Sequence, residues 1–453
     1  MIYDVIILGA GPGGYLAAER AGHAGLKTML IERNKVGGVC LNEGCIPSKT
    51  LLNSAKIYEY TTKGKKFGVL CEGVSYHQDK VIQRKNIVVK KLVNSIQGVL
   101  SKNKVTFIEG EAIIKGKTED GFVVIVNQEE HVGKNMIIAT GSEALIPPIP
   151  GIKASYEAGI VLTNREILDL ITVPEKLVVI GGGVIGLEMA CYYATIGSEV
   201  TVIEMLSRIG GSTDPEISTI LKGNLEKKGI KFLLCAKVTK VEGNNISYIL
   251  EGRETVLKGD KILLSIGRRP NTADIGLKSI GVVVEKGAVK VDETCRTNIP
   301  GVYAVGDVNG KSMLAHTAYR EAEVAVHTIL GNKDRMRYHA IPSVIYTNPE
   351  VASVGETEET AKNKGIEVIV KNISMNYSGR YMAENEQGDG IAKVIIDKKY
   401  NKIIGIQMIG SYASEMIYGG SLMIETEMLV KDLQEIIFPH PTVSEIIREA
   451  IFL

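Results

Sequence analysis

Two cysteines in the segment GGVCLNEGCIPSKTLL, residues 37–52, are the side chains best suited to chemistry. Cys40 and Cys45 lie five positions apart, and the four residues between them can form a compact loop that brings the sulfurs together. Pro47 suits the first turn of a helix, which puts Cys45 at a helix N-terminus, where the dipole favours a thiolate. We interpret the pair as a redox-active disulfide. On spacing alone, a structural bridge or two unrelated buried thiols remain open.

A glycine-rich turn near the N-terminus is typical of a dinucleotide site. The apolar run YDVIIL leads into Gly9, Gly11 and Gly14, a helical stretch follows, and a second apolar run ends at Glu32. The glycines allow a tight turn, close approach of a pyrophosphate, and packing of helix on strand. Glu32 can accept hydrogen bonds from a ribose diol. The order of these features predicts a βαβ dinucleotide-binding unit.

The same pattern returns at Gly181, Gly183, Gly186 and Glu204, displaced by 172 residues (181 − 9 and 204 − 32). Two units with identical internal spacing indicate two dinucleotides, most simply a tightly held redox cofactor and a soluble nicotinamide partner. The alternative is that one of the two units is empty. Glu204 favours NAD over NADP, because a carboxylate repels a 2′-phosphate and the nearest cation, Arg208, lies farther along the loop.

Together with these motifs, the segments SIGRRPN (265–271), TNIPGVYAVGDV (297–308) and HPTVSE (440–445) make the chain resemble the pyridine nucleotide–disulfide oxidoreductases. Within that family it most resembles the members that oxidise dihydrolipoamide with NAD, and the resemblance runs from Tyr3 to the last residues. It implies an α/β fold with two Rossmann-like dinucleotide-binding domains and a C-terminal α+β dimerisation domain. We expect an FAD-binding domain with the redox disulfide (1–143), an NAD-binding domain (144–270), a central domain completing the FAD site (271–340) and an interface domain (341–453).

The resemblance also implies roles for single residues. FAD would occupy the first unit and NAD the second, Lys49 would pair with Glu188 beside the flavin, and His440 would be the acid–base group that Glu445 orients. Further contacts to the flavin cofactor and the nucleotide are implied for Gly141, Gly267, Asp307, Ala315 and His316.

Each of these residues has a simpler reading. Lys49 and Glu188 could be solvated surface charges, and Asp307 could cap a turn. A lone histidine such as His440 is more often structural than catalytic. Glu445 fits a capping box with Thr442, because TVSE matches S/T-x-x-E ahead of an apolar run.

The resemblance implies a reaction and its partners. Dihydrolipoamide on a lipoyl-carrying protein would reduce the disulfide, as in 2-oxo acid dehydrogenase, acetoin or glycine cleavage systems. His440 is remote in sequence from Cys40, and relatives place it across a two-fold interface, so we expect an obligate homodimer with shared sites. The alternatives are an NAD(P)H-dependent disulfide reductase acting on glutathione-like or metal substrates, and a non-catalytic flavin-binding interaction subunit.

Composition restricts the other classes. The 453 residues are too many for one ordinary core, and 53 basic against 52 acidic residues give no global field for nucleic acid or anionic membrane. Arg84 to Lys104 reads as an amphipathic helix with a solvated basic face. No apolar run is long enough to cross a bilayer, and six cysteines form neither a disulfide framework nor a metal pattern. We therefore expect a cytoplasmic protein with no metal.

Overall fold

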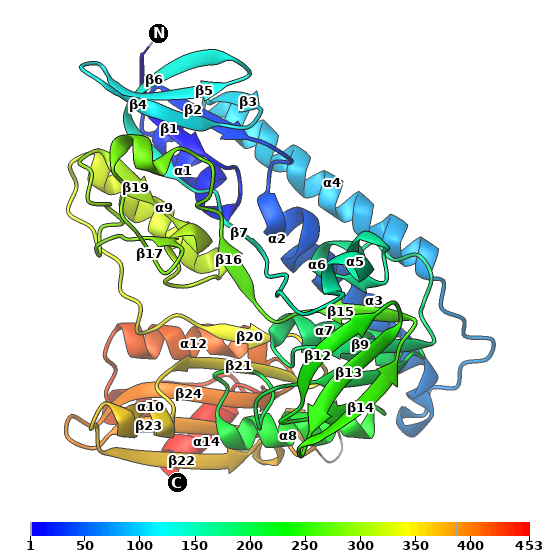
Figure 1. Ribbon diagram of the computed structural model, residues 1–453. Coiled ribbons are helices and arrows are strands. Elements are labelled where there is room, and N and C mark those ends of the chain that lie inside the picture. Colours follow the sequence, from blue (N-terminus) through cyan, green and yellow to red (C-terminus); the bar gives the residue numbers. More distant parts are fainter. Residues whose placement is uncertain (1, 386–387) are drawn as a thin grey trace. The chain divides into compact units, whose positions relative to one another are not determined.

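The computed structural model describes residues 2–385 and 388–453 and contains two compact units, each assembled from segments far apart in the sequence (Figure 1). Unit 1 comprises residues 1–50, 80–145 and 267–337, and unit 2 comprises residues 51–79, 146–266 and 338–453. The chain thus returns to unit 1 after residue 266. The division into four domains stays a prediction.

Unit 1 is built on a seven-stranded sheet whose central strands are parallel. Its order is β3-β2-β1-β6-β5-β4, and β19 also pairs with β6, in parallel. Strands β1 and β2 are almost continuously buried, as parallel strands covered on both faces must be. The strands are β1 (Ile2–Leu8), β2 (Thr28–Glu32), β3 (Thr106–Glu109), β4 (Ile113–Thr118), β5 (Gly121–Val126), β6 (Glu129–Ile138) and β19 (Val302–Ala304).

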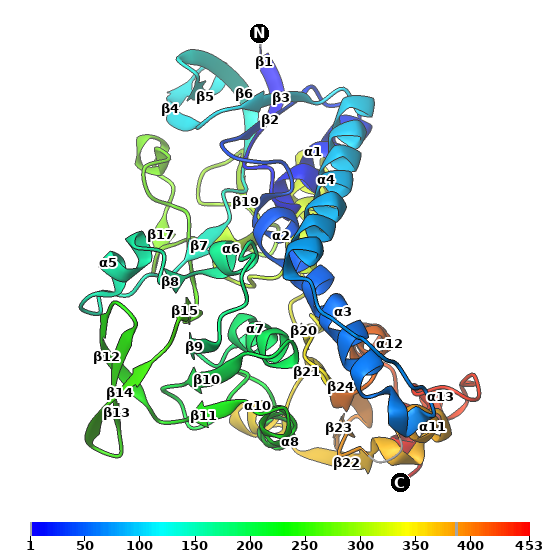
Figure 2. The same ribbon diagram turned by 90° about the vertical axis from the view of Figure 1, so that its right-hand side faces the viewer.

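Helices position the first glycine-rich turn and the two cysteines of unit 1. Helix α1 (Pro12–His23) follows β1 and packs against α9 (Ala315–Ile329), while α2 (Gly38–Glu43) leads into α3 (Cys45–Thr62). The long helix α4 (Gln78–Lys102), drawn in light blue in Figure 2, confirms the helix predicted for this stretch. The prediction that the basic face of this helix is solvated is wrong at Lys85, which is only 2% exposed.

The second glycine-rich turn belongs to unit 2 and follows a strand of a five-stranded parallel sheet, whose order is β11-β10-β9-β15-β8. Helix α7 (Val184–Thr195) follows β9, and α8 (Pro215–Lys227) follows β10. The strands are β8 (Val161–Leu162), β9 (Lys176–Ile180), β10 (Glu199–Ile203), β11 (Lys231–Leu233) and β15 (Lys261–Leu264). A separate antiparallel sheet is formed by β12 (Lys237–Glu242), β13 (Asn245–Leu250) and β14 (Arg253–Lys258).

The C-terminal part of unit 2 is an antiparallel sheet of order β20-β21-β24-β23-β22. Ala392, Val394 and Ile396 of β23 share one core with α12 (Ala413–Glu425) and α14 (Glu445–Phe452), so both helices cover that face. Helix α8 packs against β24. The strands are β20 (Ser343–Ile345), β21 (Glu350–Gly355), β22 (Val368–Ser374), β23 (Ile391–Asp397) and β24 (Lys402–Gly410).

The remaining elements are short. In unit 1, β7 (Ser142–Ala144) pairs with β16 (Arg268–Pro270), and β17 (Val284–Glu285) pairs with β18 (Ala288–Val289). The other helices and 3-10 turns are η1 (Gly64–Phe67), α5 (Ile152–Glu157), α6 (Asn164–Ile167), η2 (Leu277–Ile280), η3 (Gly306–Asn309), α10 (Glu358–Asn363), η4 (Met375–Tyr377), α11 (Gly379–Asn385) and α13 (Val430–Gln434).

The predicted fold class is confirmed: two parallel sheets follow the two glycine-rich turns, and an antiparallel sheet with helices forms the C-terminal part. Within the described residues, none of the helices combines the length and the apolar character that crossing a bilayer requires.

Candidate redox site and dinucleotide sites

Cys40 and Cys45 are joined by a disulfide, with their Cα atoms 4.7 Å apart. This confirms the predicted pairing. Cys45 is the first residue of the 18-residue helix α3, and Pro47 lies in its first turn. The dipole of that helix stabilises a thiolate on Cys45 when the disulfide is reduced. The loop expected between the cysteines is wrong, because Cys40 lies inside the short helix α2.

The redox segment is fastened to the first glycine-rich turn. The backbone N–H of Gly37 donates to the carbonyl of Ala10 over 2.8 Å. A Cβ on Gly38 would lie 2.6 Å from the Cα of Gly11, so only glycine permits this approach. The disulfide therefore follows directly on a segment that touches the predicted pyrophosphate turn.

The first turn has the geometry of a dinucleotide site. Gly9 has φ +99°, and a Cβ on Gly14 would come within 1.7 Å of the Gly9 carbonyl oxygen, so α1 can approach β1 only with glycine at both positions. The carboxylate of Glu32 accepts from the backbone N–H of Ala10 (2.6 Å) and of Asn34 (2.8 Å). The buried Glu32 is thus fixed at the end of β2, where a ribose would lie, and these residues fit a bound dinucleotide.

The second turn repeats this arrangement in unit 2. Gly181 has φ +105°, and a Cβ on Gly186 would lie 2.2 Å from the Gly181 carbonyl oxygen. Glu204 accepts from the N–H of Gly182 and of Leu206, each over 2.7 Å. A Cβ on Gly183 would meet no protein atom within 4 Å. The absence of a side chain at Gly183 therefore leaves room at the N-terminus of α7, which suits a pyrophosphate.

Asp307 lies in η3 of unit 1 within a polar cluster that the sequence did not reveal. Its Oδ2 accepts from the Ser142 hydroxyl and lies 3.9 Å from Nε of Arg268. The wholly buried Glu321 of α9 holds the same turn by accepting from the N–H of Gly306 (2.6 Å) and from Nδ2 of Asn309 (2.9 Å). Asp307 is therefore held by side-chain partners from two strands that are distant in the sequence, β7 (Ser142–Ala144) and β16 (Arg268–Pro270), and a residue that only caps a turn would not need them.

The other predicted flavin contacts also belong to unit 1. Gly141 (φ +70°) and Gly267 (φ +123°) adopt backbone conformations that favour glycine. They flank the pairing of β7 with β16, and the N–H of Asn271 donates to the Gly141 carbonyl over 2.9 Å. Ala315 is the first residue of α9 and His316 the second. Their contacts to a flavin stay predictions.

Glu188 is only 3% exposed, so its reading as a surface carboxylate is wrong. Its Oε1 accepts from the backbone N–H of Tyr346 over 3.0 Å, a partner 158 positions away. Lys49 lies in the first turns of α3 and is half-buried. Lys49 belongs to unit 1 and Glu188 to unit 2, and their pairing stays a prediction.

His440 and Glu445 are brought together as predicted, with 2.8 Å between His440 Nδ1 and Glu445 Oε1. The N–H of Thr442 donates to Glu445 Oε2 over 2.8 Å. This hydrogen bond has the largest effect on the pKa of Glu445, which it lowers below the usual value. Burial raises the pKa, and the hydrogen bond and charge of His440 lower it further. The expected capping box is half wrong, because the Thr442 hydroxyl donates to the Pro439 carbonyl and α14 begins only at Glu445.

The four remaining cysteines and His327 lie outside the redox disulfide and the two glycine-rich turns. Cys191 and Cys295 are buried thiols whose pKa values burial raises, and Cys71 and Cys235 are exposed thiols outside any disulfide. His327 lies 2.7 Å from Asp334. Across the described ranges, no three His, Cys, Asp or Glu side chains gather as metal ligands would.

Comparison with known proteins agrees with this geometry. Residues 3–322 match the family described as pyridine nucleotide-disulphide oxidoreductase, and residues 341–451 match the dimerisation domain of that family. A dihydrolipoyl dehydrogenase of Chlamydia muridarum is 40% identical over 100% of this chain and 96% of its own length. One of Mycoplasma pneumoniae is 39% identical over 99% of this chain and 98% of its own length.

A solved structure extends the likeness to three dimensions. The HOCl-induced flavoprotein disulfide reductase RclA from Escherichia coli superposes with a TM-score of 0.87 at 28% identity, covering 100% of both chains. The family uses a flavin and a nicotinamide nucleotide, in keeping with the two turns described above. The chain is an oxidoreductase that belongs to the pyridine nucleotide-disulphide oxidoreductase family, alongside relatives named dihydrolipoyl dehydrogenase.

Proposed function

We propose that this protein oxidises dihydrolipoamide carried on a lipoyl protein and passes the electrons to NAD. The observation that carries the proposal is the Cys40–Cys45 disulfide at the N-terminus of α3, on a segment hydrogen-bonded to the first dinucleotide turn. The full-length likeness to dihydrolipoyl dehydrogenases supports the choice of dithiol. The lipoyl protein would belong to a 2-oxo acid dehydrogenase, acetoin or glycine cleavage system.

The first step is a thiol–disulfide exchange. His440 takes the proton of one substrate thiol, and the resulting thiolate attacks Sγ of Cys40. The Cys40–Cys45 bond breaks, and Cys45 leaves as a thiolate that the helix N-terminus stabilises. Glu445 holds Nδ1 of His440, so the ring keeps Nε2 as the base and its positive charge is balanced.

The second step closes the substrate disulfide. The second substrate sulfur loses its proton to solvent and attacks the first, Cys40 leaves, and the His440 imidazolium protonates it. The substrate has lost two electrons and two protons, and the enzyme holds a Cys40 thiol and a Cys45 thiolate. A bound flavin supplies the route by which this electron pair reaches the nicotinamide nucleotide.

Two carboxylates support the assignment of cofactors as FAD and NAD. Glu32 ends β2 and Glu204 directly follows β10, and each carboxylate accepts from two backbone N–H groups, one of them in the adjacent glycine-rich turn. An acidic residue at this point of a βαβ unit can accept from a ribose diol. Glu204 in particular opposes a 2′-phosphate. The roles of Lys49, Glu188, Asp307 and the two glycine-rich turns in holding these cofactors are part of the proposal.

We also propose a homodimer in which His440 serves the disulfide of the partner subunit. The supporting observations are the match of residues 341–451 to a dimerisation domain and the 77% exposure of the His440 side chain in the single chain. A group that acts across a two-fold axis must be exposed in this way before association. A cytoplasmic location completes the proposal.

The test is anaerobic reduction of NAD by dihydrolipoamide with purified protein, with glutathione as the alternative thiol and NADP as the alternative acceptor. Cys45→Ser should abolish turnover and keep the flavin bound, whereas Cys71→Ser, at an exposed cysteine outside the disulfide, should behave like the parent. A flavoprotein that turns over glutathione but not dihydrolipoamide would contradict the proposal.

A further inference from the structure

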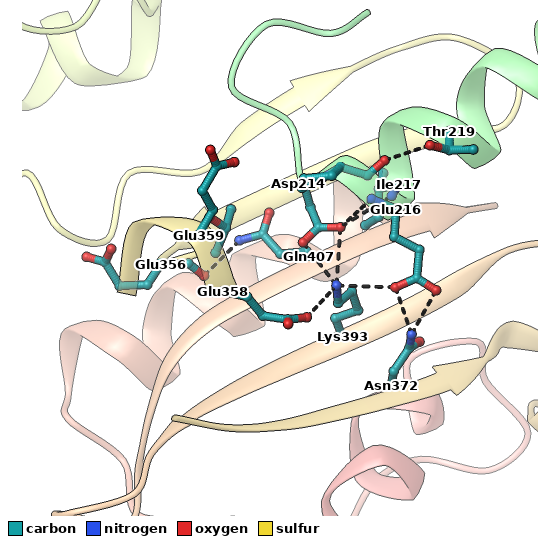
Figure 3. A network of polar contacts seen from close by, with 12 residues as sticks. Asp214, Glu216, Ile217, Thr219, Glu356, Glu358, Glu359, Asn372, Lys393 and Gln407 are labelled. Carbon is teal, nitrogen blue, oxygen red and sulfur yellow. Dashed lines mark hydrogen bonds and ion pairs between the residues drawn. The ribbon is translucent and has the colours of Figure 1, made fainter. Parts of the chain in front are cut away.

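A buried lysine joins the C-terminal sheet to the second dinucleotide-binding segment within unit 2 (Figure 3). Lys393 Nζ lies 3.1 Å from Asp214 Oδ2, 3.2 Å from Glu216 Oε2 and 2.7 Å from Glu358 Oε1. The side chains of Lys393 and Asp214 are 5% and 1% exposed. One buried cation therefore compensates the buried carboxylate of Asp214 and two carboxylates, of Glu216 and Glu358, that are about half exposed (47% and 49%).

Strand alternation explains why Lys393 points there. Its neighbours Ala392 and Val394 face the core beneath α12 and α14, so Lys393 faces the opposite side of the sheet, together with Gln407 of the paired strand. Burial alone would lower the pKa of Lys393, but the hydrogen bonds that its ammonium group donates to Glu358 and Asp214 outweigh burial and raise the pKa above its usual value. Lys393 thus stays charged across the neutral range.

Asp214 connects this lysine to the second glycine-rich turn. It is the N-cap of α8 and accepts from the N–H groups of Glu216 (3.0 Å) and Ile217 (3.3 Å). Ser218, one turn into the helix, donates its buried hydroxyl to the carbonyl of Ile209 over 2.8 Å. The start of α8 therefore fixes the loop that precedes it.

That loop carries the ribose-binding group at its other end. The N–H of Gly210 donates to the carbonyl of Gly182 over 2.8 Å, and Leu206 and Gly182 supply the two N–H groups that orient Glu204. Hydrogen bonds joined by short stretches of backbone thus connect Lys393 through Asp214, the start of α8 and the loop 205–213 to Glu204.

We propose that Lys393 is a positioning residue for the second dinucleotide site, which acts through Asp214 to hold the loop 205–213 and Glu204 in their binding geometry. The proposal rests on the assignment of this site to NAD. Lys393 touches no residue of the disulfide or of the first glycine-rich turn in its hydrogen-bonded contacts. Its loss should therefore weaken the nucleotide and spare the dithiol reaction.

The experiment compares Lys393→Met with a matched control, Lys398→Met, in the flavin-loaded holoenzyme. Lys398 lies just after the same strand but forms an exposed pair with Glu367. Two quantities are measured: the dissociation constant of ADP-ribose by calorimetry, and the anaerobic rate of flavin reduction by dihydrolipoamide without NAD. ADP-ribose carries the adenosine ribose that Glu204 would recognise, and its binding requires no turnover.

We expect Lys393→Met to raise the ADP-ribose dissociation constant and the KM for NAD about tenfold, within the roughly hundredfold loss that an ångström-scale misplacement causes. The rate of flavin reduction by dihydrolipoamide should stay at the parent value, and Lys398→Met should match the parent in every measurement. An unchanged dissociation constant in folded Lys393→Met overturns the proposal, as does an equal loss in both half-reactions.

A second variant covers the case in which Lys393→Met does not fold. Asp214→Asn keeps an N-cap acceptor for α8 but removes the charge that pairs with Lys393, so it should also weaken ADP-ribose. Parent-like ADP-ribose binding in folded Asp214→Asn would overturn the proposal. If the parent binds ADP-ribose and dihydrolipoamide does not reduce its flavin, the proposed function fails while the role of Lys393 is still tested by the dissociation constant.

Discussion

Oε1 of Glu445 lies 2.8 Å from Nδ1 of His440, while Oε2 of the same carboxylate accepts the backbone N–H of Thr442 over 2.8 Å. One carboxylate thus fixes both the imidazole ring and the turn that carries it. The two side chains differ in exposure, 77% for His440 and 18% for Glu445. The arrangement presents the ring outward and anchors it from behind, which supports the proposed role of His440 as a base that meets a thiol on another molecule.

Glu445→Gln should lower kcat/KM for dihydrolipoamide by about 10²-fold, at the lower end of what general acid–base catalysis contributes. Glutamine can still accept the Thr442 N–H, but it carries no charge to balance the imidazolium. Because the pKa of Glu445 is lowered, this carboxylate is ionised throughout the neutral range, so the negative charge that the variant removes is present under the conditions of the assay.

The measurement is the pH profile of kcat/KM, with Glu449→Gln as the control. Glu449 lies on the same helix, and its carboxylate pairs with the neighbouring Arg448 at the surface. A Glu445→Gln enzyme with the parent's profile would show that the carboxylate caps the turn and nothing more.

The sequence predicted the parts of this protein that local backbone chemistry determines. Gly9, Gly14, Gly181 and Gly186 are required where a strand turns sharply into a helix, so their spacing, together with the flanking apolar runs and the acidic residue after the second run, indicated both dinucleotide units. The spacing of Cys40 and Cys45 allowed the disulfide but also two unrelated thiols, and the neighbouring dinucleotide motifs decided between them.

Residues that depend on distant partners were missed. Charged residues such as Glu321 and Lys393 would ordinarily be expected at the surface, yet both are buried. Glu321 accepts from the backbone of the turn that precedes its helix, and Lys393 pairs with Asp214, which is far away in the sequence. A signal existed for Glu321, since it lies among Ala318, Ala322 and Ala325 on the apolar face of α9. For Lys393 the alternation of β23 placed it opposite the core but gave no partner.

Two glycines of the second turn should respond differently to alanine. Gly183 has an extended backbone (φ −80°, ψ −176°) with open space at its Cβ, so Gly183→Ala should keep the parent Tm but raise the KM for NAD, because the methyl group occupies the approach of the pyrophosphate. Gly186→Ala would place a Cβ 2.2 Å from a backbone oxygen and should lower the Tm. Thermal unfolding and NAD kinetics on both variants check this, and a Gly183→Ala enzyme with the parent KM would contradict the assigned pyrophosphate site.

Glu59 should make unit 2 sensitive to acid. Its side chain is 10% exposed, and although burial opposes ionisation, the hydrogen bond and charge of Lys228 lower its pKa to about 2. Lys63 (2.8 Å) and Asn348 (2.9 Å) also donate to it. A lowered pKa in the folded state contributes stability that is full above the unfolded pKa, near 4.5, and is lost as the pH falls towards 2.

Glu59→Gln should therefore destabilise the protein at pH 7 by on the order of 3 kcal/mol, since one pKa unit corresponds to about 1.4 kcal/mol. The difference from the parent should shrink between pH 4.5 and pH 2, the interval over which Glu59 is protonated. Thermal unfolding across this range measures it, with Glu367→Gln, at an exposed pair, as the control. A constant difference at every pH would assign the effect to packing.

Discrimination against NADP should depend on two carboxylates and not only on Glu204. Arg208 is the cation nearest to Glu204 in the sequence, and its Nη2 lies 3.0 Å from Oε2 of Glu359, in a pair of which both side chains are partly exposed (38% and 53%). Glu204→Ser removes the repulsion of a 2′-phosphate but leaves Arg208 engaged. Adding Glu359→Gln frees the guanidinium for the phosphate, so the double variant should use NADP better than Glu204→Ser does. Because exposed ion pairs contribute about 0–1 kcal/mol, the gain in kcat/KM for NADP should be at most about fivefold.

Glu359→Gln alone should not improve the use of NADP, since Glu204 still repels the phosphate. Equal NADP kinetics for Glu204→Ser with and without Glu359→Gln would show that Arg208 cannot reach the nucleotide.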